Sequence, residues 1–546
     1  MHFRPWLSLI PGIALSLAAT GCSRPQSQSP DRLAIHAIED LSPDSAEPWL
    51  GTLGRAVLEY DLSGSAKVIT TPERIGADRE LRGYLVRRGD RLEVHLALCD
   101  VPAAQTSRMI VKEGPAGEGI VPLLDAVARD VADDARAFAT RDRAALRSYG
   151  EALDATDMSA RVRLLKTAAG QDPKFSAAYL AMAGAYFAGH DLPGVAEIAS
   201  AGVRNVGDRL DRAELEDYGA IAKQDPGARE KTLTALAKLR PGHMDTLRAL
   251  GQTHTIQRKY RDAISDYETV LAAEPWDADA YNFLGYLHAY RGDLTAATES
   301  LSTYQKLTAG DPNAFDSLGE VHFYLGNFLA AERYFRQAYD KDPNTGGGRE
   351  LLKAAQAQLM TGDLSGADAV FRKTLSGSRG ASPEARELLL AQWEFMTGRR
   401  KQALARARRI PGDVAGPQLA IWQWQTAGQP VLGNIPDGVA RILQRRFADA
   451  IPLLEKSYKE TSNADDGEVR TLLAWAYMET NRAGDARPLL QLYPLPLTPG
   501  TAFSSLAFPR FLKLRALSLR ADQKLKEAEV LDELYARYAG DLPDPF

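Results

Sequence analysis

The feature that most constrains this chain is a repeat of 34 residues between Met244 and Asn344. The pair Leu-Gly recurs at positions 250–251, 284–285 and 318–319, so it returns at a constant interval. Each of these Gly residues is followed by an Ala twelve residues later and by a large residue sixteen residues later. An internal period of this length is typical of solenoid folds, in which each repeat is one supersecondary unit.

Within each repeat the pattern predicts two helices joined by a short turn. In the middle repeat, Leu284 and Leu287 place apolar side chains at helical spacing. Gly292-Asp293 follows, and Gly suits the end of one helix while Asp suits the N-cap of the next. Pro275 closes the first repeat because Pro lacks the N–H that a helix interior needs. One helix pair cannot bury its own apolar face, so we expect successive pairs to stack.

This spacing resembles the tetratricopeptide repeat family, which implies an α-solenoid whose first helices line a concave groove. The family's first large residue, usually Trp, is Leu247, Tyr281 or Phe315 here. Weaker copies of the pattern occur on both sides of the three clear repeats. We therefore predict a mainly α fold with roughly ten helix pairs. The repeats occupy 141–410, an irregular Pro/Gly/Trp segment occupies 411–437, and degenerate repeats with a cap occupy 438–546.

The amino-terminal residues 1–21 have the features of a signal peptide. Arg4 precedes an apolar run from Trp6 to Ala19, which is shorter than the roughly 20 residues of a membrane span. The run ends in Ala-Thr-Gly-Cys22, which is similar to the lipobox of bacterial lipoproteins, although Ala19 stands where that motif usually has Leu. The resemblance implies cleavage before Cys22 and acylation of Cys22, with palmitate as the expected modification. Residues 22–31 would then form a polar tether.

The predicted lipid anchor indicates where the protein resides. Two or three acyl chains hold a protein on a membrane stably, whereas one chain does not. Ser23, in place of Asp after the Cys, resembles lipoproteins that are sent to the outer membrane. We expect the protein in the cell envelope, at the periplasmic face of the outer membrane. An ordinary cleaved signal with a chance Cys, and an uncleaved anchor, are the alternatives.

Residues 32–140 predict a small α/β domain with a mixed sheet. The segments 81–88 and 91–100 flank Gly89-Asp90 and read as a hairpin, and 120–138 reads as a closing amphipathic helix. Alternation within 91–100 predicts a buried row formed by Leu92, Val94, Leu96 and Leu98. The run 81–100 is similar to TolB-amino-terminal-like domains, which often precede tetratricopeptide arrays in bacterial proteins. The resemblance implies a docking module without catalytic residues.

Few residues in this chain suggest chemistry. Cys99 lies opposite the apolar row and is interpreted as a small buried thiol. The phosphate-binding, zinc-protease, nucleophile-elbow and Cys-x-x-Cys motifs are absent from the sequence, so we predict no enzyme, no cofactor and no metal. The net charge of −5 argues against nucleic acid as a partner. We interpret the basic residues between Arg399 and Arg409 as a solvated face rather than a nucleic-acid site.

Three histidines repeat with the same interval of 34 residues, at His254, His288 and His322. One interpretation is a metal-binding or pH-sensing ladder along the stack. The other is packing, because His stands here at the family's Tyr position between neighbouring helices. Packed helices lie about 8–10 Å apart, so the outer two histidines should be too distant to share one ion. We favour the packing interpretation.

The first helices of the clear repeats carry the predicted binding surface. Tyrosine offers aromatic area with a polar end, and asparagine can bond to a peptide backbone. The predicted peptide-binding residues are Asn282, Tyr286, Tyr290, Asp316, Phe323 and Tyr324. The alternative is that these side chains pack against neighbouring helices.

Together these features favour a membrane-anchored, exported, non-enzymatic scaffold that binds a partner protein or peptide in the repeat groove. A hydrolase that uses carboxylates of the α/β domain is one alternative, and it would need two carboxylates with raised pKa values in one pocket. A sensor or regulatory component that lacks its output domain is another.

Overall fold

The computed structural model describes residues 30–42, 47–71, 76–343, 349–377, 382–411, 422, 436–461, 467–495 and 504–540. The chain divides into two compact units, of which the first ends at Phe138 and the second begins at Ala139. The predicted signal peptide, the predicted acylation site Cys22 and most of the predicted tether lie outside the described residues, as does most of the segment 411–437.

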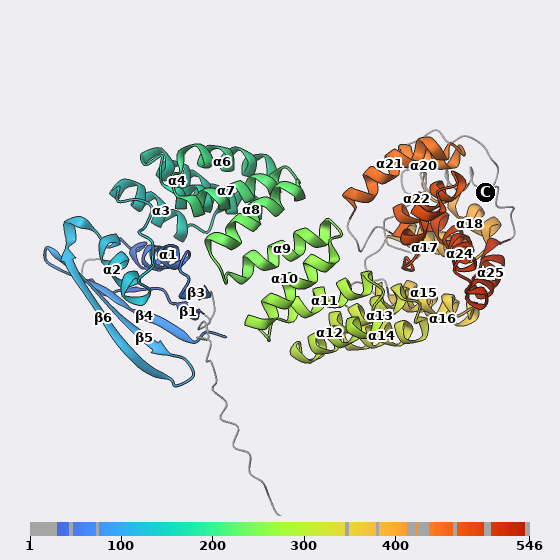
Figure 1. Ribbon diagram of the computed structural model, residues 1–546, viewed down its shortest axis with the longest axis horizontal. Coiled ribbons are helices and arrows are strands. Elements are labelled where there is room, and N and C mark those ends of the chain that lie inside the picture. Colours follow the sequence, from blue (N-terminus) through green and yellow to red (C-terminus); the bar gives the residue numbers. More distant parts are fainter. Residues whose placement is uncertain are drawn as a thin grey trace, which may run out of the picture. The chain divides into compact units, whose positions relative to one another are not determined.

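The first unit contains a six-stranded mixed sheet with two helices, α1 (Leu50–Leu62) and α2 (Val121–Val131) (Figure 1). Its strands are β1 (Asp31–Ile35), β2 (Glu39–Asp40), β3 (Val68–Thr71), β4 (Arg79–Arg88), β5 (Arg91–Asp100) and β6 (Gln105–Pro115). Five strands follow the order β3-β1-β4-β5-β6, and β2 pairs with β4. Strand β1 runs parallel to β3 and β4, whereas β4, β5 and β6 form an antiparallel meander. The predicted mixed sheet is therefore confirmed.

The hairpin and the apolar row of the first unit also agree with the sequence pattern. Gly89 has a φ of 63° in the turn between β4 and β5, a conformation that favours glycine. The four residues of the apolar row are buried: Leu92, Val94, Leu96 and Leu98. Cys99 is buried as well, with its Sγ 3.5 Å from Oγ1 of Thr106.

Helix α2 ends at Val131, so the prediction of a helix through Phe138 is wrong. The chain becomes extended at Ala132 and then bonds to the loop before β3. The Asp134 carboxylate accepts hydrogen bonds from Ser65 Oγ at 2.6 Å and from the Ala66 N–H at 2.8 Å. The Arg136 N–H also donates to the Asp61 carbonyl at 2.8 Å, so these bonds to another segment hold the chain in a path that leaves the helix.

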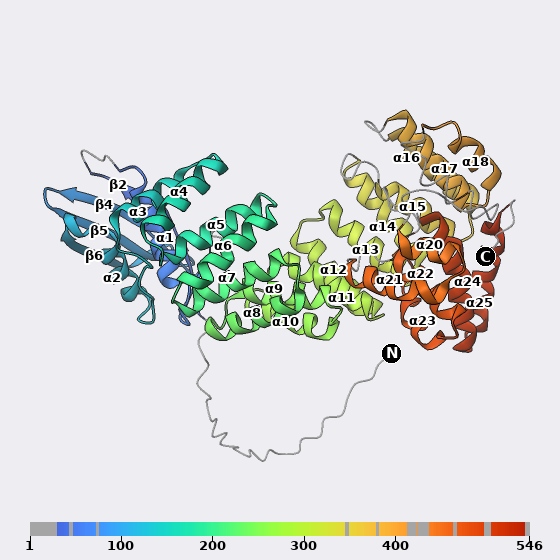
Figure 2. The same cartoon turned by 90° about the horizontal axis from the view of Figure 1, so that it is seen from above.

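The second unit is built of antiparallel helix pairs. The first helices of the pairs are α3 (Arg143–Asp154), α5 (Ser176–Ala188), α7 (Arg209–Ala222), α9 (Met244–Ile256), α11 (Ala278–Tyr290), α13 (Pro312–Tyr324), α15 (Arg349–Met360), α17 (Pro383–Met396), α20 (Asp437–Leu443), α22 (Gly467–Glu479) and α24 (Ser504–Ala521). Their partners are α4 (Met158–Gln171), α6 (Leu192–Asn205), α8 (Pro226–Leu239), α10 (Tyr260–Ala273), α12 (Leu294–Leu307), α14 (Phe328–Lys341), α16 (Leu364–Gly377), α18 (Arg400–Ala407), α21 (Phe447–Glu460), α23 (Ala483–Leu489) and α25 (Leu525–Ala539). The part of the chain that the structure describes thus holds eleven pairs, and each pair from α3 to α16 contacts the next (Figure 1 and Figure 2). This confirms the predicted α-solenoid.

The repeated glycines allow the two helices of a pair to approach closely. A Cβ added to Gly285 would lie 2.4 Å from the Leu301 side chain, and one added to Gly319 would lie 2.5 Å from the Phe335 ring. Leu301 and Phe335 are fully buried, so neither has free space to move into. The spacing of small and large residues in the sequence therefore reports direct contact between paired helices.

The turns between paired helices agree with the sequence in part. Gly292 and Gly326 both have a φ of 83°. The Asp293 carboxylate accepts a hydrogen bond from the Ala296 N–H at 3.0 Å, as expected of an N-cap residue. Asn327 makes no such cap, and its Nδ2 lies instead 3.1 Å from Nδ1 of His322.

The last pair, α24 and α25, packs against repeats that come much earlier in the chain. Leu512 and Leu534 share one buried core with Leu352 and Phe371 of α15 and α16. The Tyr538 hydroxyl donates a buried hydrogen bond of 2.6 Å to the Leu359 carbonyl. Helix α24 also contacts α17 and α22. The final pair therefore packs on the preceding pair and, at the same time, on α15–α17.

Candidate functional site

The predicted binding residues lie on consecutive first helices. Asn282, Tyr286 and Tyr290 belong to α11, and Asp316 belongs to α13. Asn282 and Asp316 hold the same repeat position, since they lie 34 residues apart. Helices α11 and α13 contact each other, so equivalent positions on them fall on one face. We call the face formed by α11, α13 and α15 around these positions the first-helix surface.

The tyrosines of this surface contact each other and the next helix. The rings of Tyr286 and Tyr290 have centroids 6.3 Å apart, and Tyr290 lies 5.3 Å from Tyr260. The Tyr286 hydroxyl donates a 2.7 Å hydrogen bond to Oε2 of Glu320 on α13. Burial raises the pKa of Tyr286 well above its ordinary value, and the Glu320 charge acts in the same direction. Tyr286 is therefore held in place by the scaffold as a neutral donor.

Phe323 and Tyr324 lie apart from the other predicted residues. Phe323 is 0% exposed and packs edge-on against Phe328 at 5.2 Å, so its ring belongs to the core. Tyr324 is buried too, and its carbonyl accepts a 2.9 Å hydrogen bond from the N–H of Tyr493 in a distant part of the chain. The structure thus brings together Asn282, Tyr286, Tyr290 and Asp316 but not these two aromatic residues.

A lysine of α15 joins α13 at this surface. Lys353 Nζ donates to Oδ2 of Asp316 and to Oε1 of Glu320, both at 2.6 Å. The three side chains are largely covered, with exposed fractions of 11% for Lys353, 19% for Asp316 and 15% for Glu320. Ion pairs this well covered are screened weakly by solvent.

Sequence reasoning missed Glu320, Lys353 and Glu350. Glu320 could have been found, because it stands 34 residues after Tyr286 at the same repeat position. Lys353 could not, since the repeat length changes before α15: the turn glycines Gly326 and Gly362 are 36 residues apart.

The charges at Lys353 are unbalanced. Burial raises the pKa of Asp316 to about 6, Lys353 acts against this rise, and the negative charges of Glu320 and Glu350 add to it. Burial acts to lower the pKa of Lys353, but the attraction of Glu320 and Asp316 outweighs it, so the net direction is upward. The ammonium group of Lys353 therefore bonds to two carboxylates, Asp316 and Glu320, while a third carboxylate, Glu350, acts on Asp316, and the ammonium group stays protonated.

Several acceptor oxygens of the first-helix surface have no hydrogen-bond partner. They are Oδ1 of Asn282, Oδ1 of Asp316 and Oε2 of Glu350. Buried polar atoms are nearly always hydrogen-bonded, and leaving one unpaired costs about 1–3 kcal/mol. These oxygens can accept hydrogen bonds from an added donor.

A second ion cluster lies on α9. Arg248 donates from Nε to Oδ2 of Asp277 at 2.7 Å and from Nη1 to Asp245 at 2.6 Å, and it also pairs with Glu274. Here one cation meets three carboxylates. The excess of negative charge therefore extends from α9 to α15.

Two of the three repeated histidines, His254 and His322, contact other side chains of the repeats. His254 Nδ1 lies 2.6 Å from Asp266, and the His322 ring stacks on Tyr334 at 5.3 Å. Burial lowers the pKa of His322, and the Arg333 charge adds to this. Among the described residues, no group of three or more His, Cys, Asp or Glu could hold a metal ion. The same part of the chain contains no helix with the length and apolar character of a membrane span.

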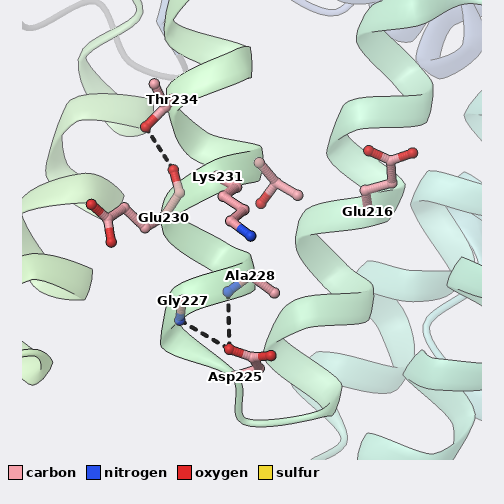
Figure 3. Close-up of a pocket in the computed structure, with 8 residues that line it drawn as sticks. Glu216, Asp225, Gly227, Ala228, Glu230, Lys231 and Thr234 are labelled. Carbon is pink, nitrogen blue, oxygen red and sulfur yellow. Dashed lines mark hydrogen bonds between the residues drawn. The ribbon is translucent and has the colours of Figure 1, made fainter.

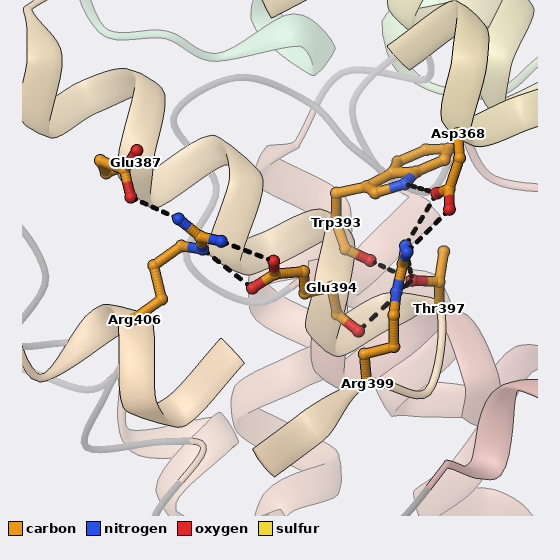
Figure 4. A network of polar contacts seen from close by, with 7 residues as sticks. All are labelled: Asp368, Glu387, Trp393, Glu394, Thr397, Arg399 and Arg406. Carbon is orange, nitrogen blue, oxygen red and sulfur yellow. Dashed lines mark hydrogen bonds and ion pairs between the residues drawn. The ribbon is translucent and has the colours of Figure 1, made fainter. Parts of the chain in front are cut away.

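The basic run near α18 is divided between the surface and the interior. Lys401, Arg408 and Arg409 are exposed, as predicted for a solvated face, whereas the prediction is wrong for Arg399, Arg400 and Arg406. In Figure 4, Arg399 donates two hydrogen bonds of 2.7 and 2.8 Å to the Asp368 carboxylate. Arg406 likewise donates two hydrogen bonds of 2.9 and 2.8 Å to the Glu394 carboxylate. Arg400 is 0% exposed. Guanidinium groups form such paired bonds with carboxylates readily. Arg399 and Arg406 therefore stabilise the repeats through their paired carboxylates.

Two hollows of the repeat surface lie away from the predicted residues. One, of about 850 Å³, lies along α7 and α8, with Glu216, Asp225, Glu230 and Lys231 in its lining (Figure 3). Asp225 accepts hydrogen bonds from the N–H groups of two residues of the following helix turn, at 3.0 and 2.9 Å. Its carboxylate therefore serves as a helix cap. The other hollow, of about 300 Å³, is lined mainly by small residues of α6 and α7.

A carboxylate hydrolase in the α/β unit would need two carboxylates with raised pKa values in one pocket. Among its described residues, the carboxylates with a displaced pKa are Glu93 and Asp134, and both are lowered. The hydrogen bond with His95 lowers the pKa of Glu93. Burial acts to raise the pKa of Asp134, but hydrogen bonds from Ser65 and Ala66 outweigh it. A general acid would need a raised pKa.

The comparisons with known proteins identify the repeats. Tetratricopeptide repeat models match residues 248–312 and 441–505. With the stacked helix pairs, this defines the chain as a protein that contains tetratricopeptide repeats. The comparison with curated proteins gives no match.

Solved structures similar to this chain include three proteins with low identity. A tetratricopeptide repeat protein from Parabacteroides merdae ATCC 43184 is 17% identical, with a TM-score of 0.34 over 50% of this chain and 99% of that one. PilW, a type IV pilus biogenesis factor, is 18% identical, with a TM-score of 0.34 over 38% and 96%. YrrB, described as having an unusual peptide-binding site, is 16% identical, with a TM-score of 0.28 over 31% and 89%.

Proposed function

We propose that this protein is a non-enzymatic scaffold that binds a partner protein or an extended peptide on the first-helix surface. The observation that carries the proposal is the set of unpaired acceptors, Asn282 Oδ1, Asp316 Oδ1 and Glu350 Oε2. An extended peptide presents N–H donors along its length, so it can satisfy such oxygens. Tyr290 and Tyr286 supply aromatic area beside them.

The pairing of the scaffold's own side chains supports this role. Tyr286, Glu320 and Lys353 are bonded to one another across three helices, so the surface is formed before a partner arrives. A preformed surface loses little side-chain entropy on binding, which favours affinity. The repeats themselves are of a type that commonly binds proteins, and YrrB is a tetratricopeptide repeat protein described as having an unusual peptide-binding site.

We further propose that the scaffold is anchored to a membrane through acyl chains on Cys22, at the periplasmic face of the outer membrane. The support is the order of charge, apolar run, Cys and polar tether in residues 1–31. Mass spectrometry of the amino-terminal peptide, with membrane fractionation of the wild type and of Cys22→Ser, tests this. An unmodified Cys22 in the wild type would contradict the anchor.

The binding function is tested by cross-linked pull-down from intact cells. Asn282→Leu removes an unpaired acceptor, whereas Gln337→Leu removes an exposed amide from α14 and serves as the matched control. We expect one protein to be captured by the wild type and the control but lost with Asn282→Leu. Capture that is equal for all three proteins would place the partner elsewhere and overturn the assignment of the surface.

A further inference from the structure

The first-helix surface also indicates the chemistry of its partner. At α13–α15, Lys353 pairs with Asp316 and Glu320, and the negative charge of Glu350 also acts on Asp316. When all three carboxylates are ionised, this cluster carries an excess of two negative charges. Charges in a low-dielectric environment interact strongly, so such an excess favours an added cation.

Most of the donors in the cluster are already used, since two of the three N–H groups of Lys353 and the Tyr286 hydroxyl are bonded. Lys353 bonds to Asp316 Oδ2 and Glu320 Oε1, and Tyr286 bonds to Glu320 Oε2. The oxygens left over are Oδ1 of Asp316 and Oε2 of Glu350. Glu350 is only 8% exposed, and its unpaired oxygen is therefore shielded from bulk water.

Geometry places these two oxygens in one locality. Glu350 and Lys353 are three residues apart on α15, so their side chains share a face of that helix. Lys353 in turn contacts Asp316 directly. The rise in the pKa of Asp316 caused by the Glu350 charge agrees with this closeness.

We propose that the α13–α15 part of the first-helix surface binds a lysine or arginine side chain of the partner, with Asp316 and Glu350 as the accepting carboxylates. This inference rests on the proposed function and adds the charge of the segment that is bound. A cationic side chain brings both the missing donors and the missing positive charge, and charge-assisted hydrogen bonds of this kind are about twice as strong as neutral ones.

Other ligand classes fit less well. An anionic segment would meet the net negative charge, which extends to Arg248 and its three carboxylates on α9–α11. A neutral segment could bond to Asn282 but would leave the charge excess at Lys353 in place. Association with a basic segment should also weaken as ionic strength rises, because salt screens the exposed part of the attraction.

The test uses three pools of immobilised extended peptides that are identical except at one fixed position, which holds lysine, norleucine or glutamate. The full chain is applied as wild type, as Asp316→Asn/Glu350→Gln, and as Glu197→Gln/Asp340→Asn. The last variant removes the same number of carboxylates from exposed sites on α6 and α14 and serves as the control. Circular dichroism melts confirm that all three proteins are folded.

We expect the wild type and the control to bind the lysine pool about tenfold more tightly than the norleucine pool, and the Asp316/Glu350 variant to lose that preference. Binding without any preference for lysine, or a preference that survives in the Asp316/Glu350 variant, would overturn this inference and leave the proposed function intact. Binding to none of the pools would contradict the proposed function itself, and the inference with it.

Discussion

Replacing Gly319 by alanine tests whether the repeat glycines are fixed by helix contact. In an open helix, alanine is favoured over glycine by about 1 kcal/mol. At Gly319, however, the new Cβ would lie 2.5 Å from Cδ1 and Cε1 of Phe335, which is fully buried. Overpacking a buried site costs about 1–3 kcal/mol, and this pair has little room to adjust. We expect Gly319→Ala to destabilise α13–α14 by about 1–2 kcal/mol.

The matched control is Gly170→Ala in α4. Gly170 is exposed, and a Cβ there would meet nothing within 4 Å. The same substitution should therefore stabilise its helix by about 0.5–1 kcal/mol. Native-state hydrogen exchange read out by mass spectrometry measures each helix pair separately, which suits a chain of many repeats. If Gly319→Ala leaves the hydrogen-exchange protection of α13–α14 unchanged or increases it, contact between the paired helices does not require glycine at this position.

Three further substitutions probe ion pairs and long-range packing. Because the pKa of Asp316 is raised to about 6 from its ordinary 3.8, the folded state holds an extra proton between these values, and the contribution of Asp316 to the unfolding free energy falls as pH rises from 4 to 7. In denaturant titrations, the change in unfolding free energy between pH 4 and pH 7 should therefore be more favourable in Asp316→Asn than in the wild type, by up to about 3 kcal/mol. An identical slope in the variant would contradict this. Tyr538→Phe removes the buried hydrogen bond to the Leu359 carbonyl and should lower the hydrogen-exchange protection of both α15 and α25 by about 1 kcal/mol. A loss of protection in α25 alone would show that this hydrogen bond does not couple the stabilities of the two helices. Arg406→Met leaves the carboxylate of Glu394, which is 4% exposed, without its cation and should lower the unfolding free energy measured with denaturant by about 3–5 kcal/mol. Adding Glu394→Gln should restore much of that free energy. If it restores none, the loss comes from packing of the Arg406 side chain and not from the unpaired charge.

Sequence periodicity predicted the contacts that repeat. Gly285 and Gly319 lie where paired helices are in contact. The recurrence of small and large residues at a fixed interval is enough to predict this contact from the sequence. The same register could have placed Phe323 in the core. Its equivalent one repeat earlier is Ala289, which is fully buried. Equivalent positions of successive repeats share the same environment, so a position that is buried in one repeat should not be predicted as a surface aromatic residue in the next.

Contacts that do not repeat were beyond the reach of the pattern. Lys353 bonds to Asp316 across a place where the repeat length changes, so no interval connects the two. The packing of α24 and α25 on α15–α17 joins residues more than a hundred positions apart, and periodicity carries no information about such pairs. The prediction that Arg399 lies on a solvated face was wrong for a related reason, because its acidic partner Asp368 lies on a different repeat.

The packing of the final pair has a consequence for how the chain is made. In a linear array, each repeat can fold as soon as its neighbour has been synthesised. The core that contains Leu352 and Phe371, however, is completed only by Leu512 and Leu534. At a synthesis rate of about 5–20 residues per second, these partners follow roughly ten to thirty seconds later. The early repeats can therefore fold during translation, while the apolar faces of α15–α17 stay exposed until the end of the chain has been synthesised. A chain truncated before α24 would keep the first part of the array and leave those faces uncovered.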